Sequence, residues 1–473
     1  MKGKYKFTFV LVALGCLTLL TKTYPLAPPP DGCYSNYTTA EGCKALQSLT
    51  SGAANTGIGW YSLFANSTGS YNTAVGAGAL DLNNADNNTA VGVAALLLNT
   101  TGIDNTANGT GALVFNDSGE GNTATGAFAM YSNTVGQFNT ANGEFTLYFN
   151  TVGERNTAIG DSALYQNTDG SRNTAVGNPA LLSNTTGNDN TAIGSDALFS
   201  NNADANTAIG ADALLNNTTG STNTATGSSA LRSNTEGGDN TADGFGALRH
   251  NTTGNNNTAI GWSALESNTT GGGNIALGIQ AGAQLTTGFD NIDIGNGGIA
   301  GESGTIRIGT LQARTFVAGI SGATVSGGTA VFINGDGQLG TSTSSARFKD
   351  EIKPMDNASE VLFGLKPVAF RYKKEIDPKR IPQFGLVAEE VEKVNPDLIV
   401  RDKEGRPYSV RYDQVNAMLL NEFLKEHRKN EEQEATIARQ QKQIDDLAAG
   451  LQKVSAEFEL SKHTPRVVAS HRD

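Results

Sequence analysis

Apolar and polar positions recur with a fixed period along more than half of this chain. The pentapeptide N-T-A-x-G, slightly varied, repeats every 17 residues, with two spacings of 16. Its copies begin at Asn55, Asn72, Asn88, Asn105, Asn122, Asn139, Asn156, Asn173, Asn190, Asn206, Asn223, Asn240, Asn257, Asn274 and Asn291, and a degenerate first copy spans 38–42. An Ala-Leu pair such as Ala163-Leu164 recurs about three residues after the glycine, and Asn-Thr-x-Gly closes the unit. This pattern predicts a short strand, a turn, a second short apolar segment and another turn.

A regular short period indicates stacked units without a globular core. Helical repeats need about 33 residues or more, and the density of Gly and Asn would break helices. We therefore expect a parallel β-solenoid over residues 31–297, with asparagine amides forming a ladder at one corner and Gly supplying positive φ there. The inward residues are small, which predicts that several chains share one core.

The pattern changes twice after the repeat. Residues 298–343 alternate in strand fashion and predict a connecting β neck. From residue 344 to about 430 the sequence is charged, aromatic and globular, and a helix is expected over 413–460.

That helix carries a heptad pattern. Apolar residues recur every seven positions at Ile437, Ile444, Leu451 and Phe458, with Leu447 and Val454 between them, Leu419 and Phe423 further up, and polar Asn430 and Gln440 as interruptions. Isoleucine at successive a positions favours a trimeric coiled coil. The alternative is a single amphipathic helix packed on its own domain.

The first residues indicate the compartment. Three lysines precede an apolar run from Phe7 to Leu20, and a Pro-rich stretch follows. Residues 1–30 therefore read as a signal peptide and leader, which predicts a secreted or cell-surface protein. Outside the reducing cytosol, Cys33 and Cys43 are expected to form a disulfide at the N-terminal end, although two unpaired thiols in a flexible leader remain the alternative.

Charge and composition exclude some functions. The formal net charge is −12, and residues before 344 hold 11 basic against 23 acidic side chains, so a nucleic-acid surface is not expected. The sequence shows no metal-ligand spacing and no phosphate loop, and we expect no metal and no cofactor.

Two resemblances to known families follow from these residues. Over 38–297 the N-T-A-[VI]-G pattern resembles the head repeats of trimeric autotransporter adhesins of the YadA type, which implies a trimeric β-roll exposed at a surface. We expect no counterpart of that family's C-terminal membrane barrel in these residues, because nothing after residue 344 alternates as apolar strands of about ten residues.

The second resemblance begins at Ser344. The blocks at 344–349, 363–372, 384–391, 396–400 and 410–413 resemble, in this order, the intramolecular chaperone auto-processing domain at the C-terminus of phage endosialidase tailspikes and other tail fibres. This implies a module that trimerises, helps the preceding β-fibre to fold and then cuts itself off with a Ser-Lys dyad.

Residues for that cut can be named from the family's opening pattern, S-D-x-R-x-K. Ser344, Arg347 and Lys349 match it, whereas Ser345 stands in place of Asp. The scissile bond would join Thr343 to Ser344. A serine hydroxyl needs a base, and a lysine can serve once burial lowers its pKa. The alternative is that Ser344 and Lys349 belong to a polar linker, or that the module no longer cuts.

The sequence thus predicts an all-β parallel β-solenoid, a trimeric β-roll, then a small α+β chaperone domain and a C-terminal coiled-coil helix. The expected function is a secreted or surface trimeric fibre, adhesin-like, whose C-terminal module is a single-turnover serine endopeptidase acting on its own chain. The alternatives are an uncleaved adhesin with the module as a trimerisation clamp, or a tailspike-like polysaccharide-degrading enzyme. A surface or glycan ligand is not identified by any motif.

Overall fold

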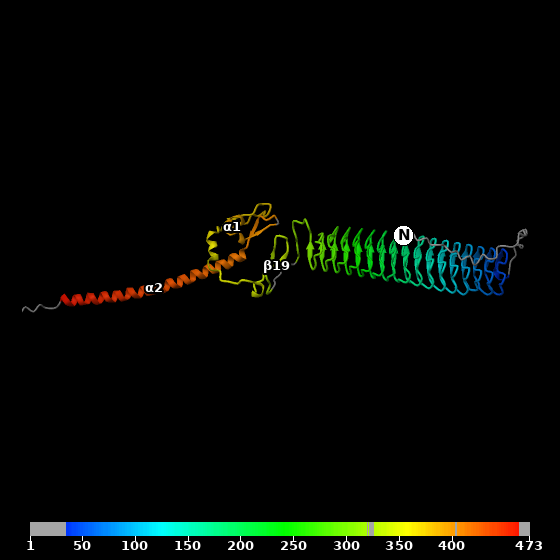
Figure 1. Cartoon of the computed structure of the whole chain (residues 1–473), viewed down its shortest axis with the longest axis horizontal. Coiled ribbons are helices and arrows are strands. Elements are labelled where there is room, and N and C mark those ends of the chain that lie inside the picture. The colour runs from blue at the N-terminus through cyan, green and yellow to red at the C-terminus, as the bar shows by residue number, and fades with distance from the viewer. Residues whose placement is uncertain (1–34, 319, 321–325, 403, 463–473) are drawn as a thin grey trace, which may run out of the picture. The chain divides into compact units, whose positions relative to one another are not determined.

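The structure is a computed structural model that describes residues 35–318, 320, 326–402 and 404–462. The chain forms two compact units, the first ending at Thr315 and the second beginning at Phe316. The predicted signal peptide and leader, residues 1–30, lie outside the described residues. Figure 1 shows the first unit as a stack of short strands and the second as a small mixed region with one long helix.

The first unit is a parallel β-solenoid with one three-residue strand in each coil, preceded by the 3-10 helix η1 (Ser35–Tyr37). Its strands are β1 Thr39–Glu41, β2 Thr56–Ile58, β3 Thr73–Val75, β4 Thr89–Val91, β5 Thr106–Asn108, β6 Thr123–Thr125, β7 Thr140–Asn142, β8 Thr157–Ile159, β9 Thr174–Val176, β10 Thr191–Ile193, β11 Thr207–Ile209, β12 Thr224–Thr226, β13 Thr241–Asp243, β14 Thr258–Ile260, β15 Ile275–Leu277, β16 Ile292–Ile294 and β17 Ile306–Ile308. Each strand pairs in parallel with the strand of the next coil, and equivalent residues stand side by side. The predicted solenoid is confirmed.

Each strand alternates between outside and inside, as a period of two requires. In β8 the central Ala158 is completely buried, whereas Ile159 is exposed and Thr157 is half-buried. The same pattern recurs in neighbouring coils, so the first and third positions of the strands form the outer face of the sheet.

Asparagine side chains form the ladder that the sequence predicts, and they form a second one as well. The backbone N–H of Asn156 donates to Oδ1 of Asn139 at 2.9 Å, and its Nδ2 donates to the carbonyl oxygen of Gly170 at 2.8 Å. In the second ladder Nδ2 of Asn167 donates to Oδ1 of Asn150 at 2.7 Å. These side chains are completely buried. Because a buried amide without partners is costly, the ladders fix the register of each coil on the next.

The glycine after each strand is required by the stacking of the coils. Gly160 has a φ of 128°, and a Cβ there would lie 2.5 Å from the carbonyl oxygen of Gly177 in the next coil. No side chain fits at that distance, which explains why this position is glycine throughout the repeat.

The Ala-Leu segment differs from the second strand-like segment that the sequence suggests. It is a tight turn in which Leu164, like its equivalents, has a left-handed φ of 52°. This conformation costs about 1–2 kcal/mol for a residue with a Cβ. The side chain is completely buried in return, which contributes about 2 kcal/mol.

One chain closes the interior of every coil. The inward alanines and leucines from Ala74 to Ala281 have no exposed area in the single chain. The argument that small inward residues require several chains to share a core is therefore wrong: the coil is narrow enough for Ala and Leu to fill it. Any association between rods must use an outer face.

The solenoid extends beyond the repeat motif. β17 pairs with β16, and Ile292 stands beside Ile306. The sequence places Ile306–Ile308 in the neck because this last coil is shorter than the others and lacks N-T-A-x-G. The solenoid strands thus run from residue 39 to 308.

The described part of the second unit contains three hairpins, four short helical turns or helices and one long helix. Its elements are β18 Val331–Ile333, β19 Leu339–Thr341, η2 Ala346–Phe348, η3 Asp356–Gly364, β20 Val368–Phe370, β21 Gln383–Gly385, α1 Ala388–Val394, η4 Pro396–Leu398, β22 Ile399–Arg401, β23 Pro407–Val410 and α2 Tyr412–Lys462. The strands pair as β18–β19, β20–β21 and β22–β23, all antiparallel. This is a small α+β region followed by a long helix, as predicted.

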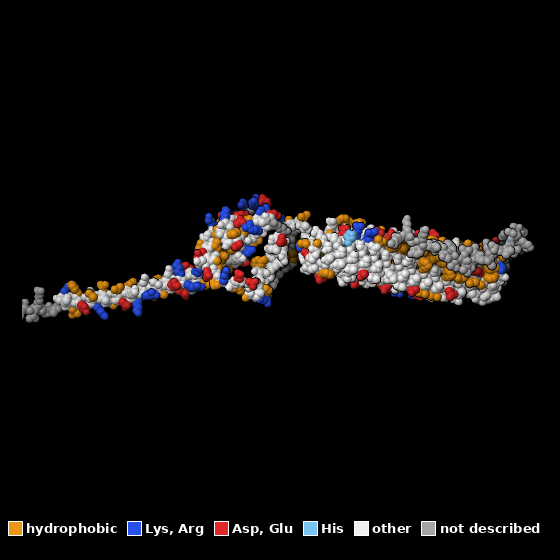
Figure 2. Space-filling model, viewed as in Figure 1, with side chains coloured by type: hydrophobic (Ala, Val, Ile, Leu, Met, Phe, Trp, Pro, Cys, Tyr) orange, Lys and Arg blue, Asp and Glu red, His pale blue; other side chains and the backbone are white. Residues whose placement is uncertain are grey.

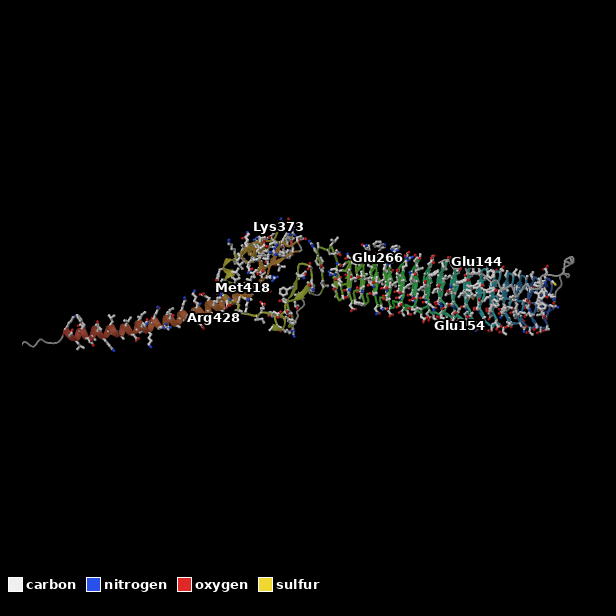
Figure 3. All side chains as sticks on the ribbon, in the orientation of Figure 1. Glu144, Glu154, Glu266, Lys373, Met418 and Arg428 are labelled. Carbon is white, nitrogen blue, oxygen red and sulfur yellow. The ribbon has the colours of Figure 1, made fainter. Side chains whose placement is uncertain are left out.

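Its core is small. Five apolar side chains are buried together, namely Val391, Leu398, Ile399, Val410 and Val415. From residue 426 to 462 every residue of α2 is exposed, and in Figure 3 the side chains beyond Arg428 project from an uncovered helix. Figure 2 shows charged and hydrophobic side chains crowded on this unit, whereas much of the solenoid surface carries neither.

Within the described residues, no helix combines the length and the apolar character needed to cross a membrane.

Candidate functional site: a serine and a lysine at the start of the second unit's globular region

The structure brings together the two side chains that the sequence nominates. Nζ of Lys349 donates a hydrogen bond to Oγ of Ser344 at 3.2 Å. Thr343 precedes this serine in the segment that follows β19. The pair is therefore at hydrogen-bond distance without any further chain movement.

A single helical turn explains how residues five positions apart meet. η2 begins after Ser345, and the N–H of Phe348 donates to the carbonyl oxygen of Ser345 at 3.0 Å. The N–H of Lys349 then donates to the carbonyl oxygen of Ala346 at 3.1 Å and ends the turn. Because a 3-10 turn winds tightly, it reverses the chain enough to return Lys349 to Ser344.

Ser345, which replaces the aspartate of the related pattern, occupies the N-cap of η2. Its side chain makes no capping hydrogen bond there. An aspartate at an N-cap accepts hydrogen bonds from the first free N–H groups of a helix and interacts favourably with its dipole. The position is thus compatible with aspartate, and serine leaves the turn without a side-chain cap.

The pair is open to solvent in the single chain. Ser344, Ser345 and Lys349 are all exposed. Arg347 lies over the ring of Phe348, with its guanidinium carbon 4.6 Å from the ring centroid. A lysine acts as a base near neutral pH when burial disfavours its charged form. The single chain thus holds the serine hydroxyl and the lysine amine together but leaves both exposed to solvent.

A second serine and lysine meet elsewhere in the unit, and sequence reasoning missed them. Buried Ser359 on η3 accepts a hydrogen bond from Nδ2 of Asn421 at 2.6 Å and donates to Glu422, both on α2. Nζ of Lys425 lies 3.5 Å from the Ser359 hydroxyl and 2.7 Å from Oε1 of Glu422. These partners follow Ser359 at a long sequence separation, so no local motif reveals them.

The second cluster is suited to structure and not to nucleophilic chemistry. Hydrogen bonds from Lys425 and Ser359 hold the pKa of the Glu422 carboxyl below its usual value. Lys425 also lies 3.9 Å from Glu360. The Lys425 amine is thus engaged by two carboxylates as well as by the serine hydroxyl. The cluster instead ties α2 to η3.

Other candidates can be placed in turn. His427 lies on the exposed part of α2, beside Phe423 and Glu431 and distant in sequence from Ser344. Across the described ranges, no three His, Cys, Asp or Glu side chains gather closely enough to hold a metal ion. Cys43 is exposed, and Cys33 lies outside the described residues, so their disulfide stays a prediction.

Comparison with known families adds to this geometry. Residues 344–400 match the peptidase S74 family, described as the chaperone of endosialidase. The chain carries a chaperone-of-endosialidase domain that follows the β-solenoid in the sequence. The match begins at Ser344, the residue that carries the candidate nucleophile, and it covers the globular elements from η2 into β22. No curated protein and no solved structure matches the chain.

Proposed function

We propose that this protein is a secreted or cell-surface trimeric fibre whose chaperone-of-endosialidase domain assembles three chains and then cuts the bond between Thr343 and Ser344. The observation that carries the proposal is the 3.2 Å contact between Lys349 and Ser344 at the first residues of the family match. The named family is a peptidase family, which supports a proteolytic role for this serine.

The chemistry proceeds within one chain. The Ser344 hydroxyl attacks the carbonyl carbon of Thr343, and the neutral Lys349 amine takes the hydroxyl proton and passes it to the Ser344 amide nitrogen as the peptide bond breaks. Water then hydrolyses the resulting ester, which frees the Thr343 carboxylate and restores the Ser344 hydroxyl. Lys349 acts as general base and then general acid.

Trimer formation would complete this site. Lys349 is exposed in the single chain, and packing of three chains would supply the burial that lets a lysine lose its proton. Exposed Ile437, Ile444 and Leu451 on α2 support such an assembly, because apolar residues at heptad spacing pack against equivalent helices. Cleavage after assembly would then trap the rod kinetically.

Charges beside the seam favour parallel helices. In the heptad frame with Ile437 at position a, Lys429 occupies a g position and Glu434 the following e position. Glu457 and Lys462 likewise occupy a g position and the following e position. In a parallel, in-register coiled coil, the g position of one chain faces the e position of the neighbouring chain, so both pairs join opposite charges.

The predicted likeness of the solenoid repeat to YadA-type head repeats stays a prediction.

One observation favours a second candidate, an uncleaved fibre in which the domain is only a clamp. Ser345 replaces the aspartate of the family pattern and leaves η2 without a side-chain cap. A looser turn would hold Lys349 less firmly. In this case the chain assembles but stays intact.

Site variants separate the two candidates. Ser344→Ala should abolish release of the fragment that begins at residue 344, and Lys349→Met should reduce its rate by at least a hundredfold, since the hydroxyl loses its base. Ser359→Ala is the matched control, because it alters the other serine that contacts a lysine and should leave the cut intact. Ser345→Asp should leave cleavage unchanged or faster, by capping η2.

The readout is the mass of each fragment over time, with no added protease. Undiminished cleavage in Ser344→Ala, or equal loss in Ser359→Ala, would show that the dyad assignment is wrong. An intact unmodified chain that is nevertheless trimeric would support the clamp.

A further inference from the structure

The outer face of the solenoid sheet changes character in its last coils. From β1 to β14 the first position of every strand is threonine, whereas β15, β16 and β17 begin with Ile275, Ile292 and Ile306. The third positions of these strands are aliphatic as well. Register places Ile275 beside Ile292 and Ile292 beside Ile306, so these side chains form a continuous surface.

Neighbouring outward positions extend this surface. Phe245, Trp262 and Ile279 stand at equivalent places in three successive coils, just beyond the strand corner. We call the whole surface the C-terminal apolar patch; it comprises Phe245, Ile260, Trp262, Ile275, Leu277, Ile279, Ile292, Ile294, Ile306 and Ile308. Ile306 is 65% exposed and Ile308 is 70% exposed. A contiguous apolar surface of this kind marks an interaction site.

The size of the patch suits a protein partner. About ten large apolar side chains, most of them close to half exposed, present roughly 800 Å², near the ~800 Å² that each partner contributes to a stable interface. The side chains of the patch are all apolar, so an occupant that is itself apolar gains most by covering them. A second copy of the same patch is such an occupant, and around a threefold axis each copy faces the other two.

We propose that the three rods of the fibre pack on one another through the C-terminal apolar patch, and that this contact keeps them joined after the C-terminal domain is released. The inference rests on the proposed trimer and names the surface that the rod uses in it. Cleavage before Ser344 removes α2 and its apolar seam, so the remaining fragment needs a contact of its own. The solenoid interior does not provide one, because each chain closes it alone.

The test exchanges the patch for the residue that the repeat otherwise uses. The patch variant combines Ile275→Thr, Ile292→Thr and Ile306→Thr, which restores the threonine found at this position in β1–β14. The matched control combines Ile159→Thr, Ile193→Thr and Ile209→Thr on the same face in the middle of the rod, where exposure is 39–42%.

Both sets are made in the full chain carrying Ser344→Ala, with the recognition sequence of a site-specific protease inserted after Thr343. Release of the domain then does not depend on the chemistry of Ser344. Native mass is measured before and after protease addition over a series of protein concentrations, and circular dichroism melting checks that the coils remain folded.

We expect all chains to be trimers before protease addition. Afterwards the rods without patch substitutions and the control rods should stay trimeric. The rods of the patch variant should dissociate into single chains at protein concentrations at least a hundredfold higher than those at which the control rods dissociate. A single Ile306→Arg change, at an exposed position where folding is not at stake, should weaken association in the same way through three facing charges.

The outcomes separate the two levels of the argument. If the unprocessed chains are single, the proposed trimer itself is wrong. If they are trimers but the released unmodified rods fall apart, or if the patch variant and Ile306→Arg hold together as well as the control, the patch is not the contact between copies.

Discussion

The solenoid and the C-terminal unit bury their side chains in opposite ways. In the solenoid, Ala158, Leu164 and Asn156 are completely covered by residues of the same chain. In the described part of the C-terminal unit only five apolar side chains form a buried core, and α2 leaves Ile437 and Ile444 exposed. The coils of the solenoid close their own interior, whereas the C-terminal unit leaves most of its long helix exposed.

This difference assigns different tasks to the two regions. Each coil depends on its neighbours alone, so stability adds along the rod, as in other repeat proteins. In the proposed trimer the C-terminal unit would gain most from association, because its apolar seam contributes free energy only when other helices cover it. Substitutions in the two regions should therefore have separate effects.

Charges in the seam of α2 should have the largest effect. Combining Ile437→Glu and Ile444→Glu would bury six carboxylates in a trimer, each at a cost of several kcal/mol. Over at least a thousandfold range of protein concentration, the variant fragment 344–473 should then be a single chain where the unmodified fragment is a trimer. The melting temperature of the solenoid should be unchanged. Lys442→Glu, on the opposite side of the heptad, is the control for added negative charge. Native mass spectrometry measures the outcome, and a variant fragment that stays trimeric would contradict it.

A methyl group at the corner of a coil should damage the solenoid and spare the C-terminal unit. Gly160→Ala places a Cβ 2.5 Å from the carbonyl oxygen of Gly177, at a φ of 128°. We expect a loss of about 3–4 kcal/mol, seen as weaker hydrogen-exchange protection in the coils around β8 and β9. Association of the fragment 344–473 should be unchanged. Full protection in this variant would show that the coils do not stack as described.

The end of the solenoid should respond to pH through Asp293. This residue replaces the inward alanine in β16, is buried, and has no hydrogen-bond partner for either carboxylate oxygen. Burial, reinforced by Glu302 and opposed by Arg307, raises the pKa of Asp293 to about 6. The folded state therefore binds this proton more tightly than the unfolded state, and stability falls as the pH rises from about 4 through 6.

Asp293→Ala should remove that dependence. A pKa of about 6 in place of the ordinary 3.8 corresponds to about 3 kcal/mol, so the variant should gain up to that amount at pH 8 and little at pH 4. The readout is hydrogen exchange of β16, corrected for the intrinsic effect of pH. Ala276→Gly is the control, because it alters the equivalent inward position without adding or removing charge. Hydrogen exchange of β16 in this variant should still depend on pH as in the unmodified chain. An equal gain at both pH values for Asp293→Ala would argue against a buried charge.

The smallest effect belongs to the glycine of the long helix. A Cβ added at Gly450 in α2 would meet no atom within 4 Å, so Gly450→Ala should be accommodated and should stabilise the helix by up to about 1 kcal/mol. The same exchange that disrupts a coil should thus strengthen α2. Thermal melting of the released fragment, monitored by its helical circular dichroism signal, tests this. A lower melting temperature in the variant would show that a Cβ at residue 450 is not accommodated.

The sequence predicts those features of the solenoid that repeat at every coil. Asn156, Ala158 and Gly160 each stand for a position that recurs at a fixed period, and the role of each residue type is distinctive: ladder amide, inward methyl and positive φ. The turn around Leu164 is not predictable in this way, because a left-handed leucine contradicts local preference and is stable only through its burial in the stack.

Closure of the core escapes prediction for a related reason. Residue size alone does not reveal how narrow the coil is, so small inward residues suggest a shared core. In the C-terminal unit, Ser344 and Lys349 can be nominated because they lie five positions apart in a recognisable pattern. The contacts of Ser359 with α2 cannot, since they join positions far apart in the sequence and follow only from tertiary packing.

We have proposed that the chain assembles and then cuts itself before Ser344. The most direct test of this proposal is the mass of the products formed by the purified, unmodified full-length chain without any added protease. We expect a fragment that spans 344–473, with Ser344 at its N-terminus, released from a trimeric precursor. A chain that stays intact, or a fragment that begins at any other residue, would contradict it.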